Sequence, residues 1–405
     1  MELHVLNESG RNRQLLKYML THREVTRQEL VDASGLTLLT VSKAVSALLE
    51  AGLLVVDGAV TGGMGRRKSL LKINPAHRYA ICVDIGFASI KIGVVLFNGR
   101  ILEKKILQGY SNPVSAGIPH AEMMAVIHEY LHRFGSERCL GIGASISGMV
   151  DFDIGRVLFC PNIHGFNERP LAAELSLATG LPVLLDTSAR CMALAESYFG
   201  IGAGIQNQVF ISLGIGSIAA GIILDKRLYR GENGFAGEIG HNRTSVAMSE
   251  MDTGRQIQCS CGGVNCLELF ATESMALGHL AELLAAYNGY SPAKTLMNGG
   301  LITQDILREA YRAGDSIVTR YIEAIAASIA AQLSATVNLV DPELIILGGG
   351  FIWDLPELKD LIERELKRSC LVPIRNRISV RTSALGENAS LQGSALQLIN
   401  HYLDN

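Results

Sequence analysis

Three cysteines and one histidine form the tightest group of ligand-type side chains in this sequence. Cys259, Cys261 and Cys266 lie within eight residues of one another, and His241 precedes them. Three thiolates and one imidazole are the donor set of a closed tetrahedral zinc site. The spacing predicts one structural Zn²⁺ per chain. The alternative is a chance grouping of cysteines in a reduced core.

The compartment expected for the chain favours a metal site over disulfides. No segment reaches the roughly 20 apolar residues that a membrane helix needs, and the N-terminus lacks the order of a signal peptide. We therefore expect a cytoplasmic protein without membrane insertion. Eight cysteines in a reducing compartment favour metal or catalytic sites.

A second set of residues suits contact with a polyanion. Residues 1–80 hold eleven Lys and Arg against seven acids, which gives this segment a net charge of +4. The whole chain has a net charge of −3, so the remaining 325 residues carry a net charge of −7. Small polar residues and one lysine follow a helical spacing, and three consecutive cations lie on a glycine-rich loop. The predicted DNA contacts are Thr37, Thr40, Ser42, Lys43, Ser46, Arg66, Arg67 and Lys68.

The elements around these residues predict a winged helix-turn-helix. Thr26 to Glu29 is a capping box that starts a short helix, and Gly35 ends it. A second helix follows Thr37, and an earlier one completes a three-helix core. The wing is expected as strands Leu53–Val56 and Ser69–Ile73, with a turn at Asp57-Gly58. The alternative is a protein-interaction module with a solvated basic loop.

Glycine turns between apolar strands occur twice in the body of the chain, residues 75–405. Asp84-Ile-Gly86 separates two apolar runs, and Gly214-Ile-Gly216 separates two more about one domain later. One such turn is weak evidence because most are structural. Two of them predict an internally duplicated α/β fold of two lobes with its ligand in a cleft.

The motifs around these turns resemble those of the ROK family, which comprises repressors, uncharacterised reading frames and sugar kinases. The matching segments are Leu228–His241, Cys259–Glu268, Cys160–Asn162, Asn338–Glu343, Gly348–Gly350 and Asn388–Ala395. The N-terminal head, residues 1–74, contains Gly65-Arg66-Arg67 and resembles the head of ROK repressors of the Mlc and NagC kind.

The resemblance implies an actin-like (ASKHA) sugar-kinase fold behind the winged helix-turn-helix. Residues 1–74 form the DNA-binding domain in this interpretation, and residues 75–198, completed by 386–405, form the first lobe. Residues 199–385 form the second lobe, with the zinc site and an expected dimer interface. The gap between His241 and Cys259 is longer than usual in the family and implies an extra loop at Val246 to Gln256.

The resemblance also implies that kinase chemistry has been lost. Aligned without gaps, Ser188 falls where the ROK kinases place the aspartate that acts as general base, and Phe87 and Ala88 replace a glycine and a threonine of the first phosphate loop. We therefore expect this chain to have no catalytic residues. The alternative alignment uses Asp186 as base and needs a two-residue gap before Glu196.

By the same resemblance, a sugar would contact Glu238, His241 and Glu268, whereas Thr187 and Ser188 replace the Asn-Asp pair of the kinases. The alternative is a purely structural zinc site without an effector.

These features together predict a DNA-binding transcriptional repressor of carbohydrate-metabolism genes. Its expected partners are operator DNA, a sugar or sugar-phosphate effector and a second copy, as a homodimer or a dimer of dimers. One rival is an active ATP-dependent sugar kinase with an appended head, and another is a DNA-binding scaffold that senses no small molecule.

Overall fold

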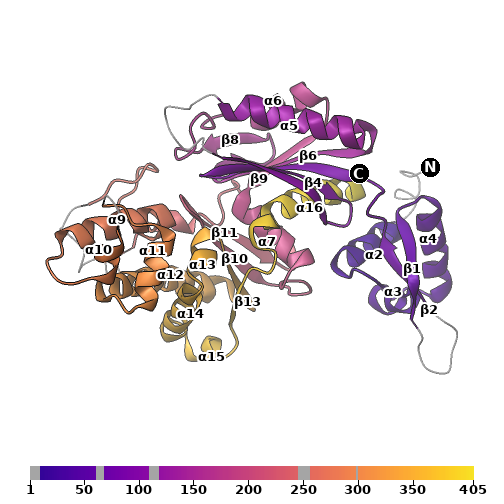
Figure 1. Cartoon of the computed structure of the whole chain (residues 1–405). Coiled ribbons are helices and arrows are strands. Elements are labelled where there is room, and N and C mark those ends of the chain that lie inside the picture. The colour runs from indigo at the N-terminus through magenta and orange to yellow at the C-terminus, as the bar shows by residue number, and fades with distance from the viewer. Residues whose placement is uncertain (1–9, 61–67, 109–117, 245–255, 298–299) are drawn as a thin grey trace. The chain divides into compact units, whose positions relative to one another are not determined.

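The structure is a computed structural model that describes residues 10–60, 68–108, 118–244, 256–297 and 300–405 (Figure 1). Its contacts divide the chain into two compact units. The first comprises residues 1–159, 165–191 and 390–405, and the second comprises residues 160–164 and 192–389. The proposed division into three domains stays a prediction.

Three helices and a hairpin form the start of the first unit: α2 (Gly10–Thr21), α3 (Arg27–Ser34), α4 (Leu38–Glu50), β1 (Leu54–Val60) and β2 (Lys68–Ile73). The capping box at Thr26 is present, with the Glu29 carboxylate accepting from the Thr26 amide at 2.6 Å. Gly35 ends α3 at φ +68°, where a side chain would be strained. Short-range caps thus fix both predicted ends of this helix.

The turn predicted at Asp57-Gly58 is wrong. Gly58 takes a positive φ of +76°, but β1 continues to Val60, and its pairing with β2 shifts between Val56 and Ala59. An extra residue in one strand of an antiparallel pair makes a bulge of this kind. The glycine therefore bends the strand without reversing the chain.

Two five-stranded sheets repeat one topology, each with two antiparallel and two parallel pairings. The first runs β5-β4-β3-β6-β9, and the second runs β12-β11-β10-β13-β14. Their strands are β3 (Tyr79–Ile85), β4 (Ser89–Leu96), β5 (Ile101–Gln108), β6 (Cys139–Ile146), β9 (Val183–Thr187), β10 (Gln208–Leu213), β11 (Ile218–Leu224), β12 (Arg227–Tyr229), β13 (Leu344–Gly348) and β14 (Ser379–Thr382). The predicted internal duplication is confirmed at the level of the sheets.

The helices that accompany the first sheet are α5 (Ile118–Phe134), η2 (Ser136–Arg138), α6 (Leu171–Thr179), α7 (Ser188–Phe199) and α16 (Ala389–Asp404), and β7 (Met149–Asp151) pairs with β8 (Arg156–Phe159). The C-terminal helix α16 packs closely, because a Cβ on Gly393 would lie 1.8 Å from the carbonyl oxygen of Cys191. Only glycine permits this approach.

The second unit holds most of the remaining helices: η3 (Ile239–His241), α8 (Glu268–Ala271), α9 (Glu273–Ala286), α10 (Pro292–Leu296), α11 (Gln304–Arg312), α12 (Ser316–Val340), α13 (Gly350–Asp354), α14 (Glu357–Ser369), α15 (Val372–Arg375) and η5 (Gly386–Asn388). Its core joins β10, β11, β13 and β14 to α9, α12 and α14.

By length and apolar composition, helix α12 could cross a membrane, and so could the bent pair α3–α4 taken as one span. The face of α12 with Ile322, Ile325 and Ile329 is buried in the core of the second unit. Packing within this unit therefore accounts for its apolar character.

Candidate metal and effector site

A compact loop positions the three cysteines. The Cys259 amide donates to the Gly263 carbonyl at 2.8 Å, and the Gly262 amide returns to the Cys259 carbonyl at 3.0 Å. Gly262 takes φ +89°, which glycine adopts without strain. A bridge between Arg243 and Cys266 holds the far end of the loop close to η3, which ends at His241.

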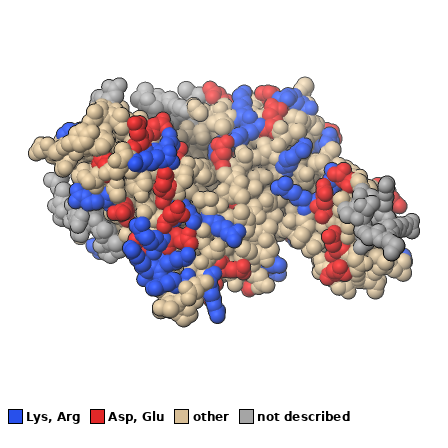
Figure 2. All heavy atoms as spheres, turned by 60° about the horizontal axis from the view of Figure 1, so that its bottom comes forward, with Lys and Arg blue, Asp and Glu red and all other residues tan. Residues whose placement is uncertain are grey.

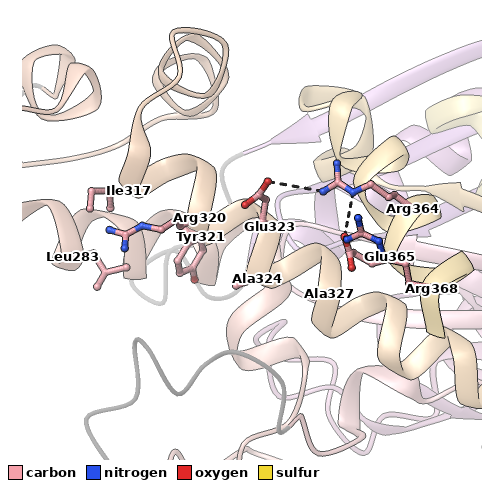
Figure 3. Close-up of a pocket in the computed structure, with 10 residues that line it drawn as sticks. All are labelled: Leu283, Ile317, Arg320, Tyr321, Glu323, Ala324, Ala327, Arg364, Glu365 and Arg368. Carbon is pink, nitrogen blue, oxygen red and sulfur yellow. Dashed lines mark hydrogen bonds and ion pairs between the residues drawn. The ribbon is translucent and has the colours of Figure 1, made fainter.

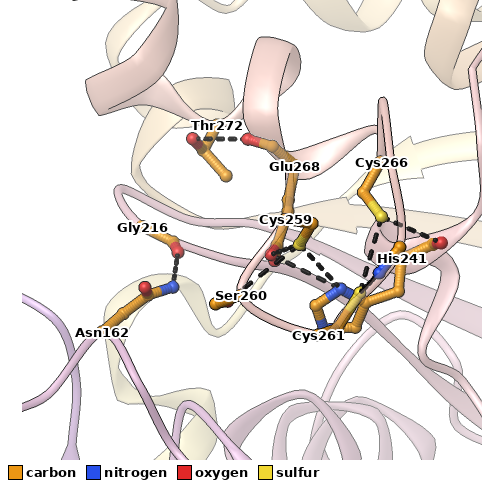
Figure 4. Close-up of polar contacts among 10 residues, drawn as sticks. Asn162, Gly216, His241, Cys259, Ser260, Cys261, Cys266, Glu268 and Thr272 are labelled. Atoms are coloured by element: carbon orange, nitrogen blue, oxygen red, sulfur yellow. Dashed lines mark hydrogen bonds and ion pairs between the residues drawn. The ribbon is translucent and has the colours of Figure 1, made fainter. Parts of the chain in front are cut away.

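The four predicted ligands come together in the fold, and their donor atoms all lie within 4.8 Å of one another (Figure 4). His241 Nδ1 lies 3.7 Å from Cys259 Sγ, and Cys261 Sγ lies 3.6 Å from Cys266 Sγ. Tetrahedral zinc with Zn–S of about 2.3 Å and Zn–N of about 2.0–2.1 Å separates its ligand atoms by comparable distances. The donor set and its geometry therefore fit a zinc ion.

The thiols in this loop differ in their titration. Burial and a hydrogen bond with Cys261 raise the pKa of Cys266 to about 12. Burial acts in the same direction on Cys261, but the Gly263 amide and the neighbouring thiols outweigh it and lower the pKa of Cys261. Metal binding requires all three groups as thiolates, so the raised pKa values of Cys259 and Cys266 should make metal affinity depend on pH.

Glu268 belongs to the same cluster. Its Oε1 lies 3.2 Å from Cys259 Sγ and 3.4 Å from His241 Nδ1, and the residue is 8% exposed at the start of α8. Of the three predicted sugar contacts, Glu268 and His241 are thus neighbours, and Glu238 lies three residues before His241 at the start of η3. One carboxylate oxygen of Glu268 faces the metal ligands, which couples any role in sugar binding to the metal site.

Neighbouring polar contacts hold this region in place. Asn162 Nδ2 donates to the Gly216 carbonyl at 3.0 Å, and Thr272 Oγ1 donates to the Glu268 carbonyl at 3.0 Å (Figure 4). The predicted extra loop, Val246 to Gln256, lies outside the described residues except for Gln256.

Ser188, the residue at the predicted position of the lost base, belongs to a polar group around Asp84 in the first unit. Ser188 Oγ donates to Asp84 Oδ1 at 2.7 Å, Ser145 Oγ donates to the same oxygen at 2.8 Å, and Lys91 Nζ lies 3.9 Å from Asp84 Oδ2. Asp84 is 4% exposed. The sequence analysis missed this partner of Ser188 because 104 residues separate the two.

Asp186, the base in the alternative alignment, is fully buried in an ion pair. Its Oδ1 accepts from Arg190 Nη1 at 2.9 Å, and its Oδ2 accepts from Gln397 Nε2 at 2.9 Å. Helix α7 runs from Ser188 to Phe199 without interruption. Asp186 therefore holds α7 against α16, and its burial argues against a role as general base.

Both glycine turns close with the same hydrogen bond. Gly86 N–H donates to the Ser89 carbonyl and Gly214 N–H donates to the Ser217 carbonyl, each at 3.0 Å. Phe87 is half-buried in the first turn. The turns are thus equivalent in backbone and differ in the side chains around them.

The predicted DNA contacts on α4 lie on its outer surface. Lys43 and Ser46 are exposed and Thr40 and Ser42 are half-buried, whereas the Thr37 hydroxyl caps the helix at the Thr40 amide. Arg66 and Arg67 lie outside the described residues, and Lys68 begins β2. The sequence analysis missed Leu38 and Leu39, which are 55% and 67% exposed in the first turn of α4 and could contact thymine methyl groups.

Charges on the described surface are mixed. On the face in Figure 2, basic and acidic side chains are interspersed over much of the surface. A broad basic field is therefore absent from the part of this face that the structure describes.

A cavity of about 490 Å³ lies elsewhere in the second unit, among α9, α12 and α14 (Figure 3). Its lining includes Arg320, Arg364 and Arg368 together with Ala324 and Ala327 of α12, and Glu323 and Glu365 pair with the arginines of α14. None of the predicted metal or effector residues lines it.

The family model of ROK matches residues 80–401, and the chain therefore belongs to the ROK family. A putative xylose repressor of Caldicellulosiruptor sp. (strain Rt8B.4) is 28% identical over 398 residues, covering 96% of this chain and 95% of that protein. A xylose repressor of Caldicellulosiruptor bescii is 27% identical over 401 residues, with the same coverage of both chains.

Solved structures agree with this assignment. A ROK family transcriptional regulator, described as a homologue of the E. coli MLC protein, shares the fold with a TM-score of 0.75 and 23% identity, over 100% of this chain and 97% of that one. A ROK glucokinase from Streptomyces griseus, solved with glucose and AMPPNP, is 28% identical with a TM-score of 0.64, over 79% of this chain and 98% of that one. Regulators and kinases thus share the body of this fold.

Proposed function

We propose that the chain is a sequence-specific DNA-binding transcriptional repressor of carbohydrate-metabolism genes, controlled by a sugar or sugar-derived effector. The similarity to xylose repressors along 96% of the chain, head included, carries this proposal. Three helices and a hairpin precede the ROK body, as a winged helix-turn-helix requires. We also propose that the protein acts as a homodimer or a dimer of dimers, because paired heads read a pseudo-palindromic operator.

Operator binding tests the role of the head. In a gel-shift assay, Lys43→Ala with Ser46→Ala should weaken binding to the operator, and Arg66→Ala with Arg67→Ala should reduce the salt slope by about 0.9 per lost phosphate contact. Lys105→Ala removes an exposed cation from β5 and serves as the matched control. Equal loss with the control variant would reject the head as the DNA-binding surface.

Zinc and effector belong to the second unit in this proposal. His241, Cys259, Cys261 and Cys266 would hold the ion, which closes the loop, and Glu238, His241 and Glu268 would contact sugar hydroxyls. Replacing one charged acceptor costs about 1.5–3 kcal/mol, or roughly tenfold to a hundredfold in affinity.

The effector is tested by operator release across a panel of hexoses and pentoses. Glu268→Gln should weaken sugar-induced release while DNA binding without sugar stays intact. Because Glu268 touches the metal ligands, zinc content must be equal in both proteins. Release that survives in the zinc-loaded variant would remove Glu268 from the effector site.

The proposed repressor is not an enzyme. Ser188 is engaged by the buried Asp84 carboxylate, and Asp186 is engaged by Arg190 and Gln397. We expect no sugar-dependent ATP consumption by the wild type in a coupled assay, and none after Ser188→Asp because Phe87 stays in the first turn. Kinase turnover by the wild type would contradict this proposal and establish the rival function, sugar phosphorylation, as in the ROK glucokinase that the chain resembles.

A further inference from the structure

A buried carboxylate that the proposed function does not use lies in the second unit. Glu273, the first residue of α9, is 1% exposed. Its Oε1 accepts from Gln304 Nε2 at 2.5 Å, whereas its Oε2 has no hydrogen-bond partner among the described residues. Burial, with the nearby charge of Asp354, raises the pKa of this carboxyl group.

Two glycine turns surround this carboxylate. The Glu273 amide donates to the Gly214 carbonyl at 3.3 Å, and the Ser274 amide and hydroxyl donate to the Ile215 carbonyl at 3.0 and 2.7 Å. On the other side, a Cβ on Gly350 would lie 2.9 Å from Glu273 Oε2 and 3.6 Å from Ile215 Cγ1. The carboxylate therefore fills the space between the turn after β10 and the turn after β13.

The position of these turns marks a ligand site of the fold. β10 and β13 are parallel neighbours, so their carboxyl ends meet at one edge of the sheet. Open α/β sheets bind ligands at that edge, and glycine turns there present amides to phosphate groups. The glucokinase that shares this fold was solved with a nucleotide analogue.

An unpaired carboxylate at such an edge opposes a phosphate in two ways: it occupies the volume, and it repels negative charge in a place with few compensating partners. We propose that Glu273 excludes nucleoside polyphosphates from the second lobe of this protein. The inference deepens the proposed function and rests on it, because it assigns a residue that keeps a regulator closed to the cofactor of its kinase relatives.

The test is calorimetric titration of Mg-ADP into full-length, zinc-loaded protein. Glu273→Gly removes both charge and volume, and Glu273→Gln removes only the charge. Each is made in the wild type and in a Phe87→Gly background, which eliminates the first turn as an alternative obstacle. Glu282→Gln, an exposed change of the same charge on the same helix, is the control.

We expect no measurable affinity in the wild type and the control. In the Phe87→Gly background, Glu273→Gly should bind Mg-ADP at least tenfold more tightly than its parent, with Glu273→Gln in between. Tight binding by the wild type would overturn the proposal, as would absence of binding in both folded Glu273 variants of that background. Operator binding of the same preparations separates these outcomes from a failure of the proposed function, which concerns DNA alone.

Discussion

Two buried carboxylates lie beside two equivalent glycine turns, and their surroundings differ. Asp84, two residues before the first turn, accepts hydrogen bonds from Ser145 and Ser188 and has Lys91 nearby. Glu273, bonded to the second turn through its amide, has one carboxylate oxygen without a partner among the described residues. The same backbone framework thus carries a satisfied charge in one unit and an unsatisfied one in the other.

The difference indicates which unit depends on something outside the chain. In the first unit the polar groups expected at a kinase centre, Asp84 and Ser188, are hydrogen-bonded to each other, and Ser145 donates to the same carboxylate oxygen. The second unit holds the cluster of three thiols and one imidazole, whose donor set fits a metal ion, and the carboxylate of Glu273, whose charged form burial destabilises. Its stability should therefore respond to metal, pH and ligands more strongly than that of the first unit.

Metal removal should produce the largest effect and should be confined to the second unit. Cys261→Ser leaves three ligands, and we expect zinc affinity to fall by at least a hundredfold and the second unit to unfold at lower temperature. Elemental analysis measures the zinc content, and calorimetry measures the unfolding temperature. Cys370→Ser, a buried cysteine away from the cluster, is the control. Wild-type protein that contains no zinc after metal-free purification and reloading would contradict the site.

Breaking the internal pairing of the first unit should come next in size. Arg190→Ala leaves Asp186 buried without its cation, and removal of one partner of a buried pair costs about 3–5 kcal/mol. Chemical denaturation measures the free energy of unfolding. Gln397→Ala, which removes a neutral partner of the same carboxylate, should cost less. Equal stability of Arg190→Ala and wild type would show that the pair contributes nothing.

A smaller change should distinguish the two carboxylates directly. Ser188→Ala removes a hydrogen bond to buried Asp84, and bonds to charged groups contribute about 1.5–3 kcal/mol. Glu273→Gln keeps the oxygen that accepts from Gln304 and removes a charge that has no partner at Oε2, so it should not destabilise the protein. The comparison fails if denaturation shows equal losses for both variants.

The smallest expected effect is a pH dependence from Glu273. Burial raises its folded pKa above the ordinary value of 4.5. Its contribution to stability is therefore fully present below that ordinary value and is lost as pH rises through the raised pKa. Melting temperatures of wild type and Glu273→Gln should diverge over this interval, the variant losing less with rising pH. Parallel curves would contradict the raised pKa.

Much of the local structure could be predicted from the sequence. The capping box at Thr26 and the glycine at position 35 set the ends of α3 because caps act within one helical turn. The four candidate metal ligands were predicted from donor type and spacing, and the fold brings their donor atoms within 4.8 Å of one another. The prediction of a turn at Asp57-Gly58 was wrong because a glycine with positive φ suits a β-bulge as well as a chain reversal, and only strand pairing decides between the two.

Residue types and their spacing by themselves determined the order of the elements in residues 10–73, the duplicated hairpins and the candidate metal donor set, since each depends on residues that are near in sequence. Tertiary structure alone decided which carboxylates have partners. Asp84 meets Ser188 across 104 residues, Asp186 meets Gln397 across 211, and Glu273 lies between turns contributed by β10 and β13. Such contacts have no signature in local spacing, because burial and desolvation depend on which distant segments pack together.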